Sequence, residues 1–219
     1  MIDMDERIQW GDAELLALTR STSFATPAGD WSDSRGHLLL FYHIAKWVNW
    51  PEPETPQAIR RPLVLEIGVR EGPSSLALLT AMRETGGKLI SLECDAEVAA
   101  VARQVVERAG LMPWWQLEVA RSEDYAASVT DPLDVLVIDG DHSEKQVRLD
   151  VEHYAHKVRP NGFILFHDYW SDAGCRQQPV SPPFPSDVSV VVEELRATGD
   201  YEVLVMPWSF GLAVCRKLR

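Results

Sequence analysis

From residue 62 onward, short apolar runs alternate with amphipathic segments, and this alternation restricts the fold more than any other feature of the 219-residue sequence. Runs rich in Val, Ile and Leu are typical of buried strands, and the segments between them have helical length. The expected strands are residues 63–67, 88–92, 115–119, 133–138 and 162–166, and the expected helices are residues 74–84, 96–109 and 143–157. Alternating strands and helices predict a parallel sheet with helices on both faces.

The last part of the chain departs from this alternation. Residues 188–196 predict a helix, whereas residues 202–206 and 211–215 predict two strands with only residues 207–210 between them. This link is too short for a helical crossover, so the two strands must be antiparallel. The sequence therefore predicts an α/β fold, Rossmann-like and doubly wound, with a mostly parallel seven-stranded sheet and a C-terminal antiparallel hairpin.

Residues 1–59 show no strand pattern. Apolar residues approach helical spacing in two segments, residues 12–19 and 35–48. Residues 21–30 predict a loop between them, and a proline-rich connector at residues 50–56 precedes the first strand. Each proline removes a backbone donor and disfavours helix at the residue before it, so a new element should begin after the connector.

Charge and composition argue against several classes of protein. The 33 acidic and 21 basic residues give a formal net charge of −12, which repels nucleic-acid backbones and anionic lipids. Apolar runs are shorter than the roughly 20 residues of a membrane helix, and the acidic first residues are not expected to act as a secretory signal. Cys94, Cys175 and Cys215 form no Cys-x-x-Cys pair. We therefore expect a cytoplasmic protein without nucleic-acid or membrane partners, and a homo-oligomer is left open.

A glycine-containing turn, Glu66-Ile-Gly68-Val-Arg70-Glu-Gly72-Pro-Ser74, follows the first strand. Doubly wound sheets bind ligands at the carboxyl ends of strands, and Gly68 and Gly72 would let the backbone approach one. A tight turn without a ligand is the alternative. Arg70 occupies the second glycine position of a dinucleotide fingerprint, so an NAD enzyme ranks last. Glu66 would repel a pyrophosphate and favours a cationic ligand.

The next two strand ends also carry polar residues. Glu93 ends the second strand, where an acid can accept both hydroxyls of a ribose, and Asp95 could share or replace it. A solvated strand-end charge is the alternative for Glu93. Ser122 and Glu123 follow the third strand, and we expect them near an adenine edge.

Acids and histidines follow the fourth and fifth strands, in Ile-Asp139-Gly-Asp141-His142 and His167-Asp168-Tyr. Neighbouring carboxylates repel unless they are protonated or bridged by a cation, so the three acids suggest a hard divalent metal with oxygen ligands. Asp141 could instead cap the next helix, His142 could be a solvated loop residue, and His167 a satisfied core histidine. Asp139 and Asp168 end buried strands, where an unpaired charge is costly.

Over roughly residues 60–219 the sequence resembles the class I S-adenosylmethionine (SAM)-dependent methyltransferases. The resemblance rests on Glu66-x-Gly68-x-x-x-Gly72, on Glu93 and on the closing strand at residues 211–217. It implies a SAM-binding Rossmann-like core at residues 60–219 and a helical cap at residues 1–59 within the same domain. The amino-acid end of SAM would lie at the glycine turn beside Glu66, and its ribose at Glu93. The implied cofactor-binding residues are Glu66, Gly68, Gly72, Ser74, Glu93, Ser122, Glu123 and Asp139.

The two acid and histidine motifs resemble those of the metal-dependent small-molecule O-methyltransferases, which include the catechol, caffeoyl-coenzyme A and macrolide-sugar enzymes. The match implies that Asp139 and Asp168 are metal ligands and places His142 at the position of the general base. The chain departs from the family after Asp168, because the catechol-type enzymes have Asp-Asn and the sugar enzymes have acid pairs, whereas this sequence reads His167-Asp168-Tyr169. The third ligand is therefore open, and His167 is the candidate substitute. Magnesium is the expected ion, although imidazole suits Zn, Fe or Ni better and leaves the metal open.

The expected function is SAM-dependent, metal-assisted O-methylation of a hydroxyl on a small metabolite, catechol-like or a sugar or other natural product. A metal-dependent hydrolase or hydroxylase on the same acids is one alternative, and a non-catalytic cofactor-binding subunit is another. The proline-rich residues 179–185 are expected at the rim of the acceptor site. Aromatic residues expected at the same rim are Trp31, Tyr42, Trp47, Tyr169 and Trp170.

Overall fold

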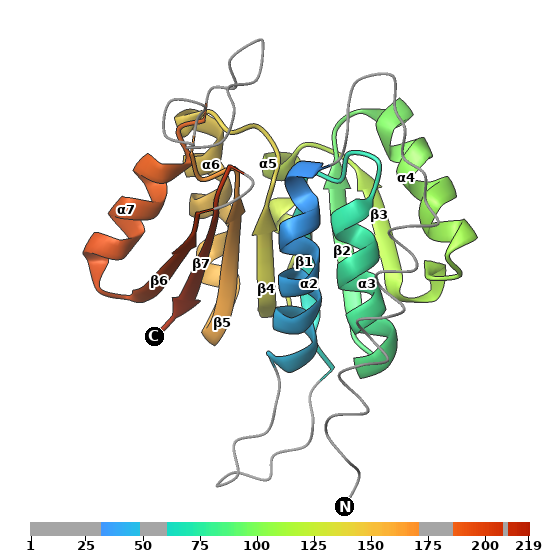
Figure 1. Cartoon of the computed structure of the whole chain (residues 1–219), viewed down its shortest axis with the longest axis horizontal. Helices are drawn as coiled ribbons and strands as arrows, with labels where there is room; N and C mark the ends of the chain where they lie inside the picture. The colour runs from blue at the N-terminus through green and yellow to red at the C-terminus, as the bar shows by residue number, and fades with distance from the viewer. Residues whose placement is uncertain (1–31, 49–60, 171–185, 208–209) are drawn as a thin grey trace, which may run out of the picture.

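The computed structural model describes residues 32–48, 61–170, 186–207 and 210–219. Seven strands form one sheet in the order β3-β2-β1-β4-β5-β7-β6 (Figure 1). The strands are β1 Leu63–Ile67, β2 Lys88–Glu93, β3 Trp115–Val119, β4 Leu133–Ile138, β5 Val158–His167, β6 Tyr201–Met206 and β7 Leu212–Lys217. The α-helices are α2 Ser32–Trp47, α3 Pro73–Thr85, α4 Ala96–Arg108, α5 Ser122–Tyr125, α6 Glu144–Tyr154 and α7 Val188–Thr198. The segments expected at residues 12–19, 50–56 and 179–185, together with Trp31, lie outside the described residues.

The pairing of the strands confirms the predicted fold. β1, β2, β3, β4 and β5 pair in parallel, whereas β7 pairs antiparallel with both β5 and β6. The chain runs outward from β1 to β2 and β3, then returns to β4 on the other side of β1. The strand order therefore reverses between β1 and β4, which is where doubly wound sheets bind their ligands.

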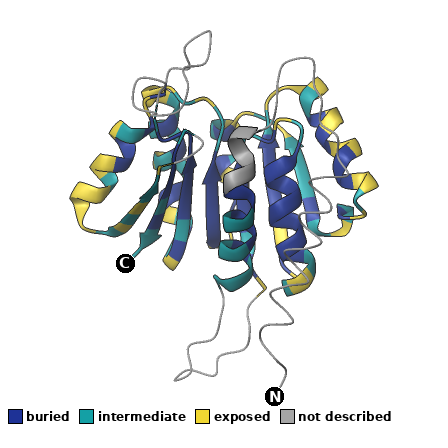
Figure 2. Ribbon diagram, in the orientation of Figure 1, coloured by how far each residue is buried: buried dark blue, intermediate teal, exposed yellow. Residues whose placement is uncertain are grey.

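Helices cover both faces of the sheet, and each face has its own buried core. Successive strand residues point to opposite faces, so Val64 and Leu89 pack with α2, α3 and α4, while Leu65 and Ile90 pack with α6 and α7. Figure 2 shows buried residues in the strands and on the inner helix faces, with exposed residues on the outer sides of α4 and α7. Because helices cover both faces in the described part of the chain, a polar ligand would approach the sheet at the ends of its strands.

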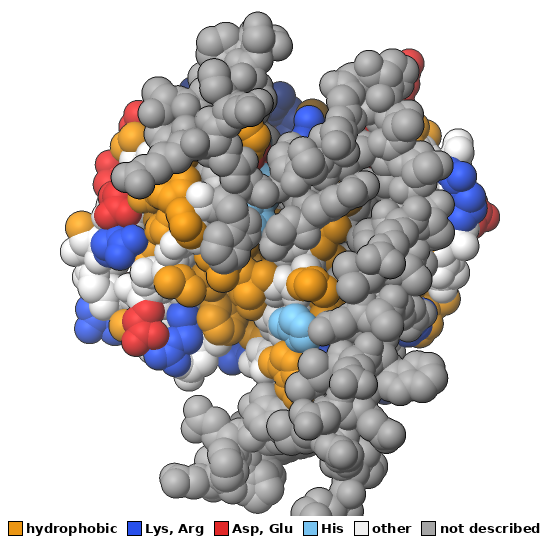
Figure 3. Space-filling model, in the orientation of Figure 1, with side chains coloured by type: hydrophobic (Ala, Val, Ile, Leu, Met, Phe, Trp, Pro, Cys, Tyr) orange, Lys and Arg blue, Asp and Glu red, His pale blue; other side chains and the backbone are white. Residues whose placement is uncertain are grey.

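The helix expected at residues 35–48 corresponds to α2, which packs beside α3. Tyr42 donates a hydrogen bond to Glu84 Oε2 at 2.9 Å, and Lys46 Nζ lies 2.7 Å from the same oxygen. Figure 3 shows hydrophobic side chains gathered beside α2 over β5 and β7, and the partly buried Phe163 and Val214 belong to this face. Among the described helices, none has the length and apolarity needed to cross a membrane.

Three element boundaries differ from the sequence prediction by three or more residues: the start of α2, which is Ser32 instead of residue 35, the start of β5 and the end of α6. β5 begins at Val158, four residues before the expected strand, because the register between β4 and β5 shifts around Leu133 and Val135 and accommodates extra residues. Gly162 lies within this irregular stretch, where a Cβ would approach Asp134 O to 2.8 Å. The helix expected at residues 143–157 ends at Tyr154 and continues as a 3₁₀ turn, η3 Ala155–Lys157.

Candidate active site

A cavity of about 430 Å³ opens at the carboxyl ends of β1, β2 and β4, beside the point where the strand order reverses. Its volume falls within the range of small-molecule sites. Five of the predicted cofactor-binding residues line it, together with the predicted base and one of the other predicted metal ligands. Those lining residues are Gly68, Glu93, Ser122, Glu123, Asp139, His142 and Asp168.

The glycine turn forms one wall of this cavity and is held by Glu93. Glu93 Oε2 accepts hydrogen bonds from the backbone N–H groups of Val69 and Arg70 at 3.2 Å, and its Oε1 accepts one from Asp95 N at 3.0 Å. Gly68 has φ +86°, and a Cβ there would lie 2.2 Å from Asp139 O. Gly68 is therefore required by the close approach of the β1 and β4 ends, whether or not a ligand is bound.

Asp95 has a separate structural role. Its Oδ1 accepts hydrogen bonds from Glu97 N at 2.8 Å and Val98 N at 3.2 Å, so it caps α4. The acid at this strand end that faces the cavity is Glu93.

Three predicted cofactor-binding residues, Glu66, Gly72 and Ser74, are not among the residues that line the cavity. Gly72 has φ +94° and precedes the first residue of α3. The Glu66 carboxylate is buried and accepts hydrogen bonds from Ser75 Oγ at 2.6 Å and Ser91 Oγ at 2.7 Å. Burial raises the pKa of Glu66 to about 7, since the hydroxyls of Ser74, Ser75 and Ser91 offset only part of the desolvation.

Glu66→Gln is expected to stabilise the protein at pH 8. The folded-state pKa of Glu66 lies above its ordinary value of 4.5, so its contribution to stability is complete below pH 4.5 and is lost as pH rises through about 7. A neutral glutamine removes this loss, a gain of up to about 3 kcal/mol. Urea unfolding at pH 5 and pH 8 measures it, with the exposed Glu107→Gln as control. An equal effect of Glu66→Gln at both pH values would contradict the assignment.

A polar network forms the cavity wall at the predicted adenine edge. Gln146 Nε2 donates to Ser122 Oγ at 3.2 Å and to Asp150 Oδ1 at 3.1 Å, while Ser122 Oγ also donates to Asp150 Oδ1. Asp150 is buried, and its Oδ2 has no hydrogen-bond partner within the described part of the chain. Arg121 pairs with Glu123 at 2.6 Å and, mainly by hydrogen bonding, lowers the pKa of Glu123 to about 2.

Sequence reasoning missed Gln146 and Asp150, both of which line the cavity. A signal for Asp150 was available in the helical spacing. Val147 and Tyr154 are buried at i and i+7 of α6, and Asp150 at i+3 shares their face. An acid on the buried face of an amphipathic helix is expected to have a specific polar partner or ligand.

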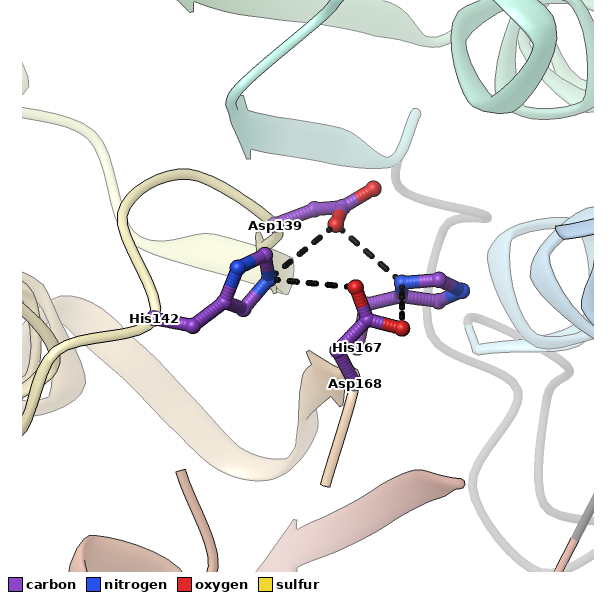
Figure 4. Close-up of side chains that lie close together, drawn as sticks. All are labelled: Asp139, His142, His167 and Asp168. Atoms are coloured by element: carbon purple, nitrogen blue, oxygen red, sulfur yellow. Dashed lines mark ion pairs between the residues drawn. The ribbon is translucent and has the colours of Figure 1, made fainter. Parts of the chain in front are cut away.

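The second half of the site is a cluster of four side chains from the ends of β4 and β5. Donor atoms of Asp139, His142, His167 and Asp168 all lie within 4.8 Å of one another (Figure 4). His167 Nδ1 lies 3.2 Å from Asp139 Oδ1 and 3.0 Å from Asp168 Oδ1. His142 Nε2 is farther away, 3.5 Å from Asp139 Oδ1 and 3.6 Å from Asp168 Oδ2.

The electrostatics of this cluster couple the histidines to the carboxylates. Burial alone would lower the pKa of His167, but Asp139 and Asp168 outweigh it and raise that pKa well above its usual range. Burial likewise opposes ionisation of Asp139, and His167 and His142 outweigh it, so the pKa of Asp139 is lowered. Asp139 and Asp168 therefore favour the protonated form of His167, and the two histidines favour the ionised form of Asp139.

The backbone at Asp168 is held in an uncommon conformation. Asp168 has φ +51°, in the left-handed region that non-glycine residues seldom adopt. Ser186 Oγ donates to Asp168 O at 2.6 Å, and the next two residues bond to the segment before β7: Tyr169 N donates to Gly211 O at 3.2 Å and Trp170 N to Phe210 O at 2.8 Å. These contacts fix the direction in which the Asp168 side chain leaves the backbone.

Asp141 lies outside the cluster. Its Oδ1 accepts a hydrogen bond from Ser143 N at 2.8 Å, and Ser143, two residues later, is the residue that caps α6. The sequence suggested Asp141 as a metal ligand or a helix cap. In the structure its side chain instead stabilises the turn that precedes the capping residue Ser143. His142, the next residue, turns toward the carboxylates instead.

Two of the aromatic residues expected at the acceptor rim are core residues, so that expectation was wrong for them. Tyr42 is fully buried between α2 and α3, and Tyr169 is 7% exposed with its hydroxyl bonded to Glu193 Oε1 at 2.7 Å. The half-buried Trp47 and Trp170 do not line the cavity either. The positions of these four aromatic residues in the sequence did not distinguish a residue at the rim of the acceptor site from a residue of the hydrophobic core.

Comparisons with known proteins agree with this architecture. A family described as "Methyltransferase domain" matches residues 65–169. A catechol O-methyltransferase from Niastella koreensis is 28% identical over 144 residues, covering 63% of this chain and 58% of that protein. The chain thus spans less than two thirds of the length of this curated relative.

Solved structures with the same fold include two O-methyltransferases. The enzyme from Bacillus cereus, in complex with SAH, has a TM-score of 0.64 and 18% identity, covering 99% of this chain and 93% of that one. TomG from Streptomyces achromogenes, involved in tomaymycin synthesis and in complex with SAM, has a TM-score of 0.61 and 16% identity, covering 96% and 90%. At these identities the similarity shows the fold.

Proposed function

We propose that the chain is a SAM-dependent O-methyltransferase that acts on a hydroxyl of a small metabolite, because residues 65–169 match a family described as "Methyltransferase domain" and lie on a Rossmann-like sheet. SAM would occupy the part of the cavity between Gly68, Glu93 and Ser122. The acceptor would occupy the part next to Asp139, His142 and Asp168. SAM and SAH in the two solved relatives support this assignment.

One observation carries the proposal: a single cavity joins the predicted nucleoside contacts to the acid and histidine cluster. Glu93 and Ser122 line it together with Asp139, His142 and Asp168. A hydrolase would use the cluster alone and has no need of a nucleoside site. Transfer of a methyl group requires donor and acceptor in one space, aligned for direct attack.

The cluster gives its two histidines different roles in this proposal. His167 is buried, lies closest to both carboxylates and is not among the residues that line the cavity, so with Asp139 and Asp168 it would hold a divalent ion. Such an ion lowers the pKa of an acceptor hydroxyl and fixes its oxygen. His142 lines the cavity and is farther from the carboxylates, so its Nε2 would accept the hydroxyl proton.

Calorimetry with SAM and with its demethylated product, S-adenosylhomocysteine (SAH), tests the first half of the proposal. Turnover of a panel of catechols, sugars and other vicinal diols, with and without a chelator, tests the second. We expect one SAM bound per chain and chelator-sensitive methylation of at least one diol class. An absence of SAM binding would refute the methyltransferase assignment.

Glu93→Ala is expected to weaken SAM binding by roughly 1 to 3 kcal/mol, because two ribose hydroxyls would lose their acceptor. The variant also removes the acceptor for the Val69 and Arg70 amides, so the glycine turn loosens as well. Calorimetry measures the loss. Asp95→Ala is the matched control, since this neighbouring carboxylate caps α4. Equal weakening by both variants would assign the loss to helix stability and not to the ribose.

A further inference from the structure

We infer that the ion held by Asp139, His167 and Asp168 is a divalent transition metal of the manganese-to-zinc series and not magnesium. This inference rests on the metal-assisted function proposed above. It concerns donor atoms that the chain itself places at the ends of β4 and β5. The argument depends on the position of one imidazole nitrogen, Nδ1 of His167.

His167 Nδ1 is fixed between the two carboxylates. The residue is 3% exposed, and its ring packs in a T-shaped contact against His37 of α2, with ring centroids 5.1 Å apart. Phe41, one turn later on α2, packs edge-on to the same ring, with ring centroids 6.5 Å apart. This packing keeps Nδ1 directed at the carboxylates (Figure 4). An ion bound between Asp139 and Asp168 therefore has a nitrogen donor beside it.

The spacing of the donors fits a ligand shell. Ligands about 2.0 to 2.2 Å from an ion lie about 2.8 to 3.1 Å from one another in octahedral geometry and about 3.3 to 3.6 Å in tetrahedral geometry. His167 Nδ1 lies 3.2 Å from Asp139 Oδ1 and 3.0 Å from Asp168 Oδ1, close to these separations. The three side chains can thus coordinate one ion with little movement.

The donor chemistry then selects the class of ion. Magnesium takes carboxylate oxygens and waters in near-ideal octahedral geometry, whereas imidazole suits zinc, iron, nickel and copper. A set of one imidazole and two carboxylates matches the transition ions. The left-handed backbone at Asp168 supports a built site, because such conformations are retained where the surrounding contacts enforce them, as Ser186 does here.

The test uses the full chain after removal of metal, titrated separately with Mn²⁺, Zn²⁺ and Mg²⁺. We expect one equivalent of Mn²⁺ or Zn²⁺ to bind at least about 100-fold more tightly than Mg²⁺. Pulsed electron paramagnetic resonance of the Mn²⁺-loaded protein is expected to show coupling to an imidazole ¹⁴N nucleus. Neither measurement depends on methyl transfer.

Two variants identify the nitrogen. His167→Glu keeps a donor but makes the set all oxygen, so the ¹⁴N coupling should disappear and the preference over Mg²⁺ should fall at least about tenfold. His142→Ala should retain the coupling. His156→Gln, at an exposed histidine of η3, is the matched control and should change nothing. Thermal unfolding of each variant reports whether it folds. If His167→Glu does not fold, the presence or absence of ¹⁴N coupling in the Mn²⁺-loaded wild-type protein decides the question.

Three outcomes would overturn the inference: tighter binding of Mg²⁺, a Mn²⁺ spectrum without nitrogen coupling, or no ion bound at millimolar concentration. The last outcome would mean that the cluster is not a metal site. SAM binding measured in the absence of metal separates these failures from failure of the methyltransferase assignment.

Discussion

Asp168→Asn is expected to lower methyl transfer by about 10³-fold, because several kcal/mol of transition-state stabilisation depend on a charged ligand and each 1.36 kcal/mol changes the rate tenfold. Asparagine keeps the size of the side chain and removes its charge. SAM affinity should persist, since Asp168 lies at the acceptor end of the proposed arrangement. Steady-state kinetics and calorimetry on the same preparation measure the two effects.

The control for this variant is Asp124→Asn, which removes an exposed carboxylate of α5. Unfolding curves are needed as well, because His167 would lose one of its two carboxylate neighbours. Undiminished turnover of Asp168→Asn, or full wild-type activity after exhaustive chelation, would rule out metal assistance.

His142→Ala is expected to reduce kcat by about 10² to 10⁴-fold while SAM binding persists. A general base must be unprotonated to accept the hydroxyl proton, so wild-type activity should fall toward acid pH. The variant should lack this acid limb, because it has no imidazole at this position to accept the proton. The pH dependence of kcat from pH 5 to 9 measures both effects.

Added imidazole should restore part of the activity of His142→Ala if the side chain acts only as a base. His153→Ala, on the following helix, serves as the comparison. A variant that keeps its rate and an unchanged acid limb would make His142 a structural loop residue, and deprotonation would then need another acceptor.

The order of elements and the C-terminal hairpin could be predicted from sequence because each depends on local information. Apolar runs of strand length identify β1, β2, β3 and β4, and the short link between β6 and β7 forces an antiparallel pair. Convergence of the acids followed from the same reasoning. Ile138 pairs with Phe166 in parallel register, so the residues after each, Asp139 and His167, emerge side by side.

The remaining details depend on packing between distant segments, which periodicity does not encode. Tyr42 can be buried because Glu84 of α3, a distant residue in the sequence, accepts a hydrogen bond from its hydroxyl. Gly68 is required by the carbonyl of Asp139, which lies far along the chain. The side chains of Asp141 and His142 point in different directions because of where α6 begins. The ends of helices and strands are the least predictable feature of a sequence.

The placement of β7 between β5 and β6 has a consequence for biosynthesis. The backbone that turns Asp168 toward His167 is bonded to residues 210 and 211, which precede the last strand of the sheet. The contacts that hold the backbone beside Asp168 are therefore completed only when residues 210 and 211 have been synthesised, after every residue of β1 to β5. If SAM and a metal ion bind as proposed, the residues at the SAM end of the cavity are synthesised earlier than the backbone contacts that support the metal end.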